Sequence, residues 1–291
     1  MHNAGQAPRI VLILGSAPDA VASRSWERSP FRFIVAINNA WAIRTDWDYL
    51  IYPDDFPDER LPTAQSPFAS IVKSDEFVPA QNKFGGFVYA GGTMAFTAAY
   101  WALHALKSPT SLAFLGCDMI YPKTGHTHFY GKGTADPLRR DITLRSLEAK
   151  SGRLFVKALR GGAICLNLSS LPESRLVFPR VKPEVLARLN ARRIDALRAA
   201  FAGRIDFDAA SLAQSRETNL GYFVEDGRYW ERTAEFSEAE IDRIDALWAE
   251  SVAQLPKSAN AREACWRGNG RKPQPSALSK SPPPTIVGGA L

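Results

Sequence analysis

A polar segment, YPKTGHTHFYGKGTADP over residues 121–137, gathers titratable side chains at one place in the chain. His126 and His128 lie two residues apart, so an extended chain points both the same way, and Tyr130 and Lys132 continue that phase. A histidine with a pKa near neutrality can take a proton from a hydroxyl, while tyrosine hydroxyls and a lysine ammonium can stabilise a departing phosphate. The residues predicted to take part in catalysis are His128 as the base, His126 as second choice, and Tyr121, Tyr130 and Lys132 around the leaving group.

Two other interpretations of this segment compete with catalysis. Asp118 and the two histidines could bind zinc, but the sequence offers no clear fourth ligand. The glycines of the segment also suit a plain surface loop. We favour contact with a ligand, because the segment directly follows SLAFLGCDMI at 111–120, the strongest strand signal in the chain.

Small and polar residues also follow the first two strand-like runs. The turn GSAPD at 15–19 comes after RIVLIL, and its backbone N–H groups could face a phosphate; an ordinary strand-to-helix turn is the alternative. The turn is neither G-x-G-x-x-G nor a P-loop, so neither NAD nor ATP binding follows. Asn38 and Asn39 come after RFIVAI, where their amides suit a base or ribose edge, or simply a turn.

An acidic pair and a glycine pair complete the candidate site. Asp54 and Asp55 could hold Mg²⁺ through a nucleotide phosphate, although a solvated turn also explains them. The segment 91–93 opens a helix and suits an anionic group, while capping alone explains its threonine. The residues predicted to bind a nucleotide are Gly15, Ser16, Pro18, Asn38, Asn39, Gly91, Gly92, Thr93 and Asp118.

Short apolar runs alternate with helical stretches over the first 180 residues. Runs of this length bounded by turn residues are typical of buried strands. The alternation predicts an α/β fold with a Rossmann-like, mostly parallel sheet and helices on both faces. In such a sheet the ligand lies at the carboxyl ends of the strands, where the candidate residues fall. The predicted strands are 9–14, 32–37, 47–55, 70–74, 111–120 and 163–170, and the predicted helices between them are 94–107 and 141–160.

After about residue 180 the sequence no longer alternates short apolar runs with helical stretches. Amphipathic helices are predicted over 182–202 and 237–255, the second with a capping box that begins at Ser237. The dipeptide DG between aromatic-rich arms predicts a β-hairpin over 221–231. Its aromatic side chains are expected to pack within the hairpin, and an interface is the alternative. We therefore expect a nucleotide-binding domain over 5–180, a helical and hairpin extension over 181–255, and a disordered tail over 256–291.

Composition narrows the class of protein. The chain has 291 residues, 45% of them hydrophobic, a net charge of +6 and a pI near 9.3. Basic and acidic residues are mixed, and no RNA-binding signature is present, so nucleic acid is not expected as a partner. Cysteines 117, 165 and 265 match no zinc motif or disulfide framework, which indicates a reducing, cytoplasmic location. No signal peptide or membrane-spanning run is recognised, so membrane contact is expected to be peripheral at most. The sequence does not determine whether the protein forms an oligomer.

The order of these motifs over about residues 9–180 resembles the bacterial sialyltransferases of glycosyltransferase family 42. It is also similar to related flagellin-modifying and methanopterin-type pyrophosphokinase domains. The family's first loop, G-N-G-P-S, contacts the cytidine nucleotide; residues 15–19 keep its glycine and proline but lose the asparagine. The family's second-strand asparagine corresponds to Asn38. Its T-S-G corresponds to residues 90–92, where Thr93 is the nearest hydroxyl.

The resemblance extends to the segment that carries the histidines. The family's G-I-D-F-Y resembles residues 116–121 with Tyr121 one place late, and the resemblance implies that this tyrosine helps the phosphate leave. The family's base histidine stands in a G-H-S-K context. Here Gly131 and Lys132 align most directly, with His126 and His128 just upstream.

Three functions follow from these observations. The first is a nucleotide-sugar-dependent glycosyltransferase that needs no metal and transfers to a glycan or small-molecule acceptor. The second is a Mg²⁺-dependent pyrophosphoryl transferase in which Asp54 or Asp55 holds the metal. The third is a non-catalytic nucleotide-binding protein. Metal dependence separates the first two, and turnover separates both from the third.

Overall fold

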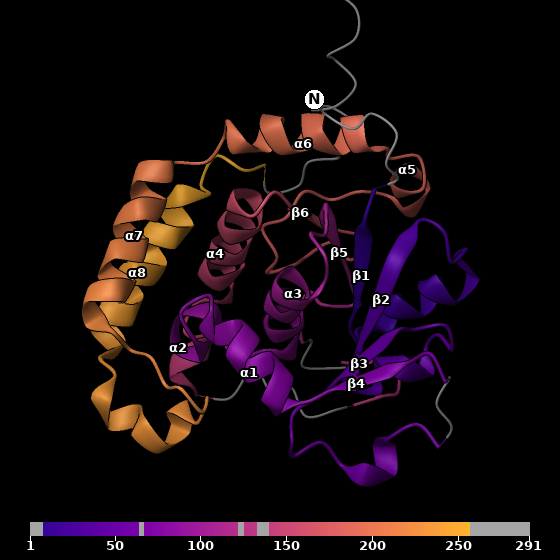
Figure 1. Cartoon of the computed structure of the whole chain (residues 1–291), viewed down its shortest axis with the longest axis horizontal. Helices are drawn as coiled ribbons and strands as arrows, with labels where there is room; N and C mark the ends of the chain where they lie inside the picture. The colour runs from indigo at the N-terminus through magenta and orange to yellow at the C-terminus, as the bar shows by residue number, and fades with distance from the viewer. Residues whose placement is uncertain (1–7, 64–66, 122–124, 133–139, 257–291) are drawn as a thin grey trace, which may run out of the picture.

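A six-stranded, all-parallel sheet forms the centre of the protein (Figure 1). The computed structural model describes residues 8–63, 67–121, 125–132 and 140–256. The strand order is β4-β3-β2-β1-β5-β6, so the chain moves outward from β1 in one direction and then returns to its other side. The strands are β1 (Ile10–Leu14), β2 (Phe31–Ile37), β3 (Tyr49–Ile51), β4 (Ser70–Val72), β5 (Ser111–Leu115) and β6 (Ile164–Asn167).

The predicted α/β class and all six predicted strands are confirmed. Each strand lies inside or within one residue of its apolar run, because a strand buried on both faces needs apolar side chains at every position. In β1 and β5 all ten residues are buried. The predicted helix over 94–107 is α3 (Met94–Ala105), and Thr93 caps it by accepting a hydrogen bond from the Phe96 N–H.

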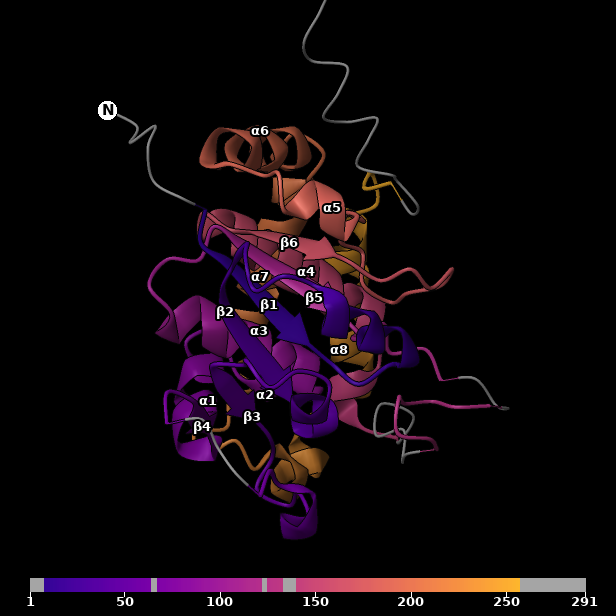
Figure 2. The same ribbon diagram turned by 90° about the vertical axis from the view of Figure 1, so that its right-hand side faces the viewer.

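Long helices cover one face of the sheet, while short 3-10 helices make the crossovers on the other. Helix α3 contacts β1 and β2, and α4 (Leu147–Arg160) contacts β6. Figure 2 views the sheet from the opposite face, with β1 and β2 in front of these helices. The 3-10 helices are η1 (Pro18–Ser25), η2 (Asn38–Ala42) and η3 (Asp58–Arg60); α1 (Ser74–Asn82) and α2 (Phe87–Ala90) precede α3, and η5 (Ile142–Leu144) precedes α4.

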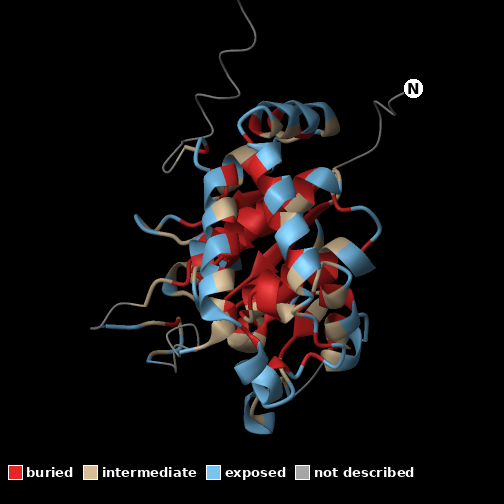
Figure 3. Ribbon diagram, turned by 90° about the vertical axis from the view of Figure 1, so that its left-hand side faces the viewer, coloured by how far each residue is buried: buried red, intermediate tan, exposed pale blue. Residues whose placement is uncertain are grey.

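The carboxyl-terminal third adds an outer layer of helices. Helix α7 (Phe207–Leu220) packs on α8 (Glu238–Ser251), which in turn packs on α4. Figure 3 views the molecule from this side and shows exposed residues on the outer helices over a buried interior. The predicted helix over 182–202 is two helices, α5 (Pro183–Leu186) and α6 (Ala191–Ala202), because Asn190 caps the second one.

The predicted β-hairpin over 221–231 is wrong. These residues form a turn that leads into a 3-10 helix, η6 (Tyr229–Glu235). The aromatic arms pack on α2 and its flank instead of pairing with each other: Tyr229 stacks on Phe87, and Tyr222 stacks on Tyr89. The predicted disordered tail lies outside the described residues beyond 256, as does Cys265.

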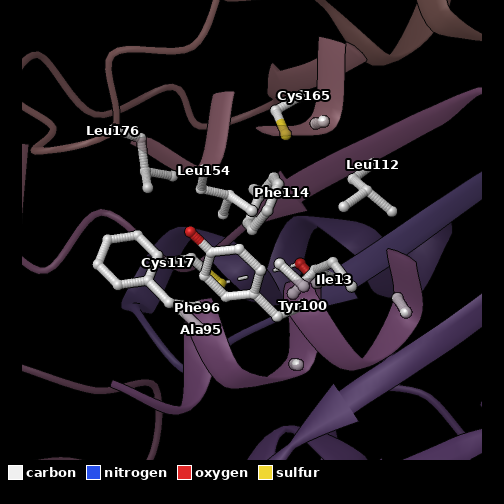
Figure 4. Packing of buried hydrophobic residues seen from close by; sticks show 14 of the residues in the cluster. Ile13, Ala95, Phe96, Tyr100, Leu112, Phe114, Cys117, Leu154, Cys165 and Leu176 are labelled. Carbon is white, nitrogen blue, oxygen red and sulfur yellow. Dashed lines mark hydrogen bonds between the residues drawn. The ribbon is translucent and has the colours of Figure 1, made fainter. Parts of the chain in front are cut away.

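The core fills the space between the sheet and the first helical layer. Figure 4 shows the Tyr100 ring of α3 beside Ile13 and Phe114 of the central strands, with Phe96 on its other side. Cys117 and Cys165 are buried free thiols in this core, as the sequence predicts. Burial raises the pKa of both thiols, so they stay protonated at neutral pH.

Candidate functional site

The sheet order reverses between β1 and β5, and two glycines meet there. The Gly15 N–H donates to Leu115 O at 2.8 Å, and the Ala17 N–H donates to Gly116 O at 3.1 Å. A Cβ atom on Gly15 would lie 2.3 Å from Gly116 O, so no other residue allows this approach. In open α/β sheets, ligand-binding crevices form at such a switch point. Because two N–H groups of the turn are already bonded, Gly15 and Ala17 do not offer them to a phosphate.

Two carboxylates lie beside this pair of glycines. Asp118 follows β5 and is 1% exposed, and among the described residues its Oδ1 accepts a single, long hydrogen bond of 3.4 Å from Asn167 Nδ2. Asp19, in η1, accepts from the Ser169 hydroxyl at 2.9 Å and from the Ser170 N–H at 3.3 Å. Burial, and to a smaller extent the charge of Asp118, raises the pKa of Asp19 above its ordinary value. The two carboxylates therefore interact across the ends of β1, β5 and β6.

Asn38 occupies the end of β2, as predicted, in a strained conformation. Its φ of 51° lies in the left-handed region, where asparagine is one of the few tolerated residues besides glycine. Its Oδ1 is buried without a hydrogen-bond partner among the described residues. Asn39, the next residue, is half-buried in η2. Strained backbone with an unsatisfied polar atom is typical of functional positions.

The histidine-bearing loop is fixed to the turn after β1. The Phe129 N–H donates to Ser16 O at 2.9 Å, and His128 and Gly131 exchange two backbone hydrogen bonds of 3.0 Å. Residues 125–132 therefore reach the switch point, which is where the sequence places them. The remaining parts of the predicted polar segment, 122–124 and 133–137, lie outside the described residues.

The two histidines of the loop have different environments. His128 is 8% exposed; its ring stacks on Tyr130 at 5.0 Å and lies 5.9 Å from Tyr121. Its Nδ1 lies 2.8 Å from Thr127 Oγ1. Burial lowers the pKa of His128, so the imidazole is neutral at pH 7 and able to accept a proton. His126, in contrast, is exposed, as is Lys132.

The segment before α3 is covered by residues that the sequence analysis missed. A Cβ on Gly92 would lie 2.5 Å from Thr143 Oγ1 and 3.0 Å from Tyr229 Oη. Asp141 joins these two residues, because its Oδ1 accepts from Thr143 and its Oδ2 accepts from Tyr229 at 3.0 Å. Gly91 has a φ of 92°, which glycine alone adopts readily. The sequence signal that could have identified Asp141 is its place as the capping residue before the 3-10 helix η5. Its hydrogen bond with Tyr229 could not be predicted in this way, because the two residues are 88 positions apart.

The acidic pair after β3 does not join the other candidates. Asp54 and Asp55 are exposed, and Asp54 accepts a hydrogen bond of 2.6 Å from the Ser74 hydroxyl. Within the described ranges, no group of three or more histidine, cysteine or acidic residues is arranged to hold a metal ion. The same portion of the chain contains no helix that is long and apolar enough to cross a bilayer.

A separate hollow lies at the opposite, amino-terminal edge of the sheet. It has a volume of about 360 Å³ and is bordered by the end of α3, the following segment up to Pro109, and Lys157 of α4. Burial, with the nearby Arg153 charge, lowers the pKa of Lys157 to about 8. The hollow contains none of the residues predicted to act on a ligand, so it is a rival location for binding.

Comparison of the chain with protein-family models, with curated proteins and with solved structures finds no match in any of the three. The resemblance to the family 42 sialyltransferases therefore rests on the short motifs quoted above. What the structure brings together at the switch point is Gly15, Ser16 and Asp19 after β1, Asp118 after β5, and His128 with Tyr121 and Tyr130 in the following loop.

Proposed function

We propose that this protein is a nucleotide-dependent transferase, and specifically a nucleotide-sugar-dependent glycosyltransferase. One observation carries the proposal: the Phe129 N–H is bonded to Ser16 O, which fixes the buried, neutral His128 beside the switch point of a parallel sheet. Nucleotides bind at such switch points in other doubly wound sheets. A neutral histidine at that place suits removal of a proton from an acceptor hydroxyl.

We place the phosphate of the nucleotide near the amino end of α3. Thr143 and Tyr229 cover Gly92 there and both donate to the Asp141 carboxylate, so these side chains must move aside when the phosphate binds. The helix has 12 residues, and the partial positive charge of its amino end attracts an anion. The turn after β1 is less suitable, because its Gly15 and Ala17 N–H groups already donate to backbone carbonyls. Tyr121 and Tyr130 flank His128 and could donate hydrogen bonds to a leaving phosphate.

The test is a thermal-shift screen of the full chain against CMP, UDP, GDP, ADP and their sugar conjugates, with and without Mg²⁺. A nucleotide at 100 times its dissociation constant stabilises the fold by about 2.7 kcal/mol. We expect a shift with one nucleotide family that does not require Mg²⁺. A shift that requires Mg²⁺ and a triphosphate would instead support a pyrophosphoryl transferase.

Two variants of the same loop separate catalysis from binding. His128→Gln should abolish transfer of the sugar while the nucleotide still stabilises the protein, because the histidine is proposed to act on the acceptor. His126→Gln is the matched control, since this histidine is exposed and should not affect turnover. Binding without turnover in the unmodified protein, over a panel of glycan acceptors, would show a nucleotide-binding protein that is not an enzyme.

A further inference from the structure

The carboxylates of Asp19 and Asp118 each keep one oxygen without a protein partner. Asp19 Oδ1 and Asp118 Oδ2 are buried and have no hydrogen-bond partner among the described residues. Asp118 is 1% exposed, so its lone contact with Asn167 leaves a charge poorly compensated inside the protein. Leaving a buried acceptor unsatisfied costs about 1–3 kcal/mol, and more when the group is charged.

Among the residues that the structure describes, Arg175 and Arg180 lie near this pair but do not neutralise it. Arg175, whose backbone N–H donates to Asp118 O, directs its side chain to Met119 O and to Glu148. Arg180 donates to the backbone carbonyls of Ser169, Leu171 and Pro172. The groups that do contact the carboxylates are neutral donors: a serine hydroxyl, a backbone N–H and an asparagine amide. The site therefore accepts hydrogen bonds and repels anions.

A ligand group that fits must supply hydrogen-bond donors and carry no negative charge. A phosphate is excluded by the two carboxylates. A metal ion is disfavoured, because no cluster of three metal-ligating side chains occurs in the described part of the chain. A pair of adjacent hydroxyls, as on a ribose ring, donates two hydrogen bonds and leaves the phosphate free to lie elsewhere. Carboxylates bind ribose hydroxyls in this way in dinucleotide-binding sheets.

We propose that Asp19 and Asp118 are specificity-determining residues that bind the ribose hydroxyls of the nucleotide. This inference rests on the proposed function, because it assigns one part of the same ligand. Asp19 is half-buried as a residue, but Asp19 Oδ1 and Asp118 Oδ2 are themselves buried, so the side chains that cover them must move aside when the ribose binds. The protein would then bind ribonucleotides and reject their deoxy analogues.

The experiment measures dissociation constants for three ligands that share one base and one phosphate group. They are the ribonucleotide that gives the largest thermal shift, its 2′-deoxy analogue and its 2′,3′-dideoxy analogue. Loss of hydrogen bonds to a charged acceptor corresponds to about 10- to 100-fold in affinity, so we expect at least ten-fold weaker binding of the dideoxy analogue. In Asp19→Asn and Asp118→Asn the preference should fall below about three-fold. Asp54→Asn, an exposed acidic residue at the same edge, should keep the full preference.

Each remaining outcome overturns a different statement. Equal affinity of the unmodified protein for all three ligands overturns this inference and leaves the proposed function intact. Absence of binding by any ribonucleotide overturns both. If the unmodified protein binds Mn²⁺ without nucleotide and Asp118→Asn does not, the pair is a cation site and the inference is wrong. Circular dichroism of each variant confirms that it is folded, and Asp19→Asn alone suffices if Asp118→Asn does not fold.

Discussion

Replacing Glu217 by glutamine should destabilise the whole protein, because this side chain joins the outer helices α7 and α8 to α4, which packs on the sheet. Glu217 of α7 is 2% exposed at its side chain, and both of its oxygens lie 2.8 Å from Arg153 of α4. Its Oε1 also accepts from Trp248 Nε1 of α8 at 2.7 Å, and Arg153 further donates to Tyr100 of α3 at 2.9 Å. One carboxylate therefore holds three helices around a fully buried guanidinium.

The magnitude follows from what the substitution leaves behind. Glutamine has nearly the same volume as glutamate, so no cavity forms, but the buried Arg153 charge loses its counter-charge. Breaking a buried ion pair by removal of one partner costs about 3–5 kcal/mol. For a chain of this size, 1 kcal/mol corresponds to about 2–4 °C, so the melting temperature should fall by roughly 6–20 °C.

Urea denaturation, followed by circular dichroism and by tryptophan fluorescence, measures the change in unfolding free energy. Glu240→Gln is the control, because the Glu240 pair with Arg243 lies on the surface of α8 and should contribute about 0–1 kcal/mol. The double variant Arg153→Met with Glu217→Leu should recover much of the loss, because it removes both charges. If Glu217→Gln costs no more than Glu240→Gln, the network does not hold the layers together and the reasoning is wrong.

Three further predictions concern the same structure. Burial alone would raise the pKa of Glu217, but attraction to Arg153 and the hydrogen bonds that Glu217 accepts hold that pKa below 4.5. The stabilisation by ionised Glu217 is therefore present above pH 4.5 and is lost on further acidification. In denaturation experiments at decreasing pH, Glu217→Gln should lose less stability between about pH 5 and pH 3 than the unmodified protein. Gly15→Ala should cost about 1–3 kcal/mol in urea melts, because its Cβ would lie 2.3 Å from Gly116 O; Gly161→Ala, with contacts no closer than 3.5 Å, should be almost neutral. Asp19→Asn should raise the melting temperature at pH 7, because a carboxyl whose pKa is raised in the fold destabilises it once ionised; an unchanged or lower value would contradict the burial of this charge.

The sheet could be predicted from local sequence, because each buried strand is a short apolar run bounded by turn residues. Helix α7 was missed, since its core face is formed by alanines 209, 210 and 213, and the buried Glu217 breaks the apolar period. The hairpin prediction failed because the turn at Gly227 is real, with a φ of 77°, while its arms find better partners in Phe87 and Tyr89. Local signals identify a turn but do not determine which distant surface its arms contact.

The candidate site likewise contains residues that could be predicted from the sequence and residues that could not. Gly15, Asn38, Asp118 and His128 could be named because strand ends of a parallel sheet meet at one edge. The role of Asp19 could not be found, since it depends on Ser169, which lies 150 residues away. The cover over Gly92, made by Thr143 and Tyr229, likewise depends on contacts that no local pattern encodes.

The central claim is that a nucleotide binds at the carboxyl edge of the sheet between β1 and β5. Hydrogen–deuterium exchange with and without the nucleotide from the thermal-shift screen tests it most directly. We expect slower exchange in peptides that cover residues 15–20 and 116–131, and unchanged exchange around Leu103–Pro109 at the opposite edge. Protection confined to the hollow beside Lys157, with none at Ser16 or Asp118, would contradict the account.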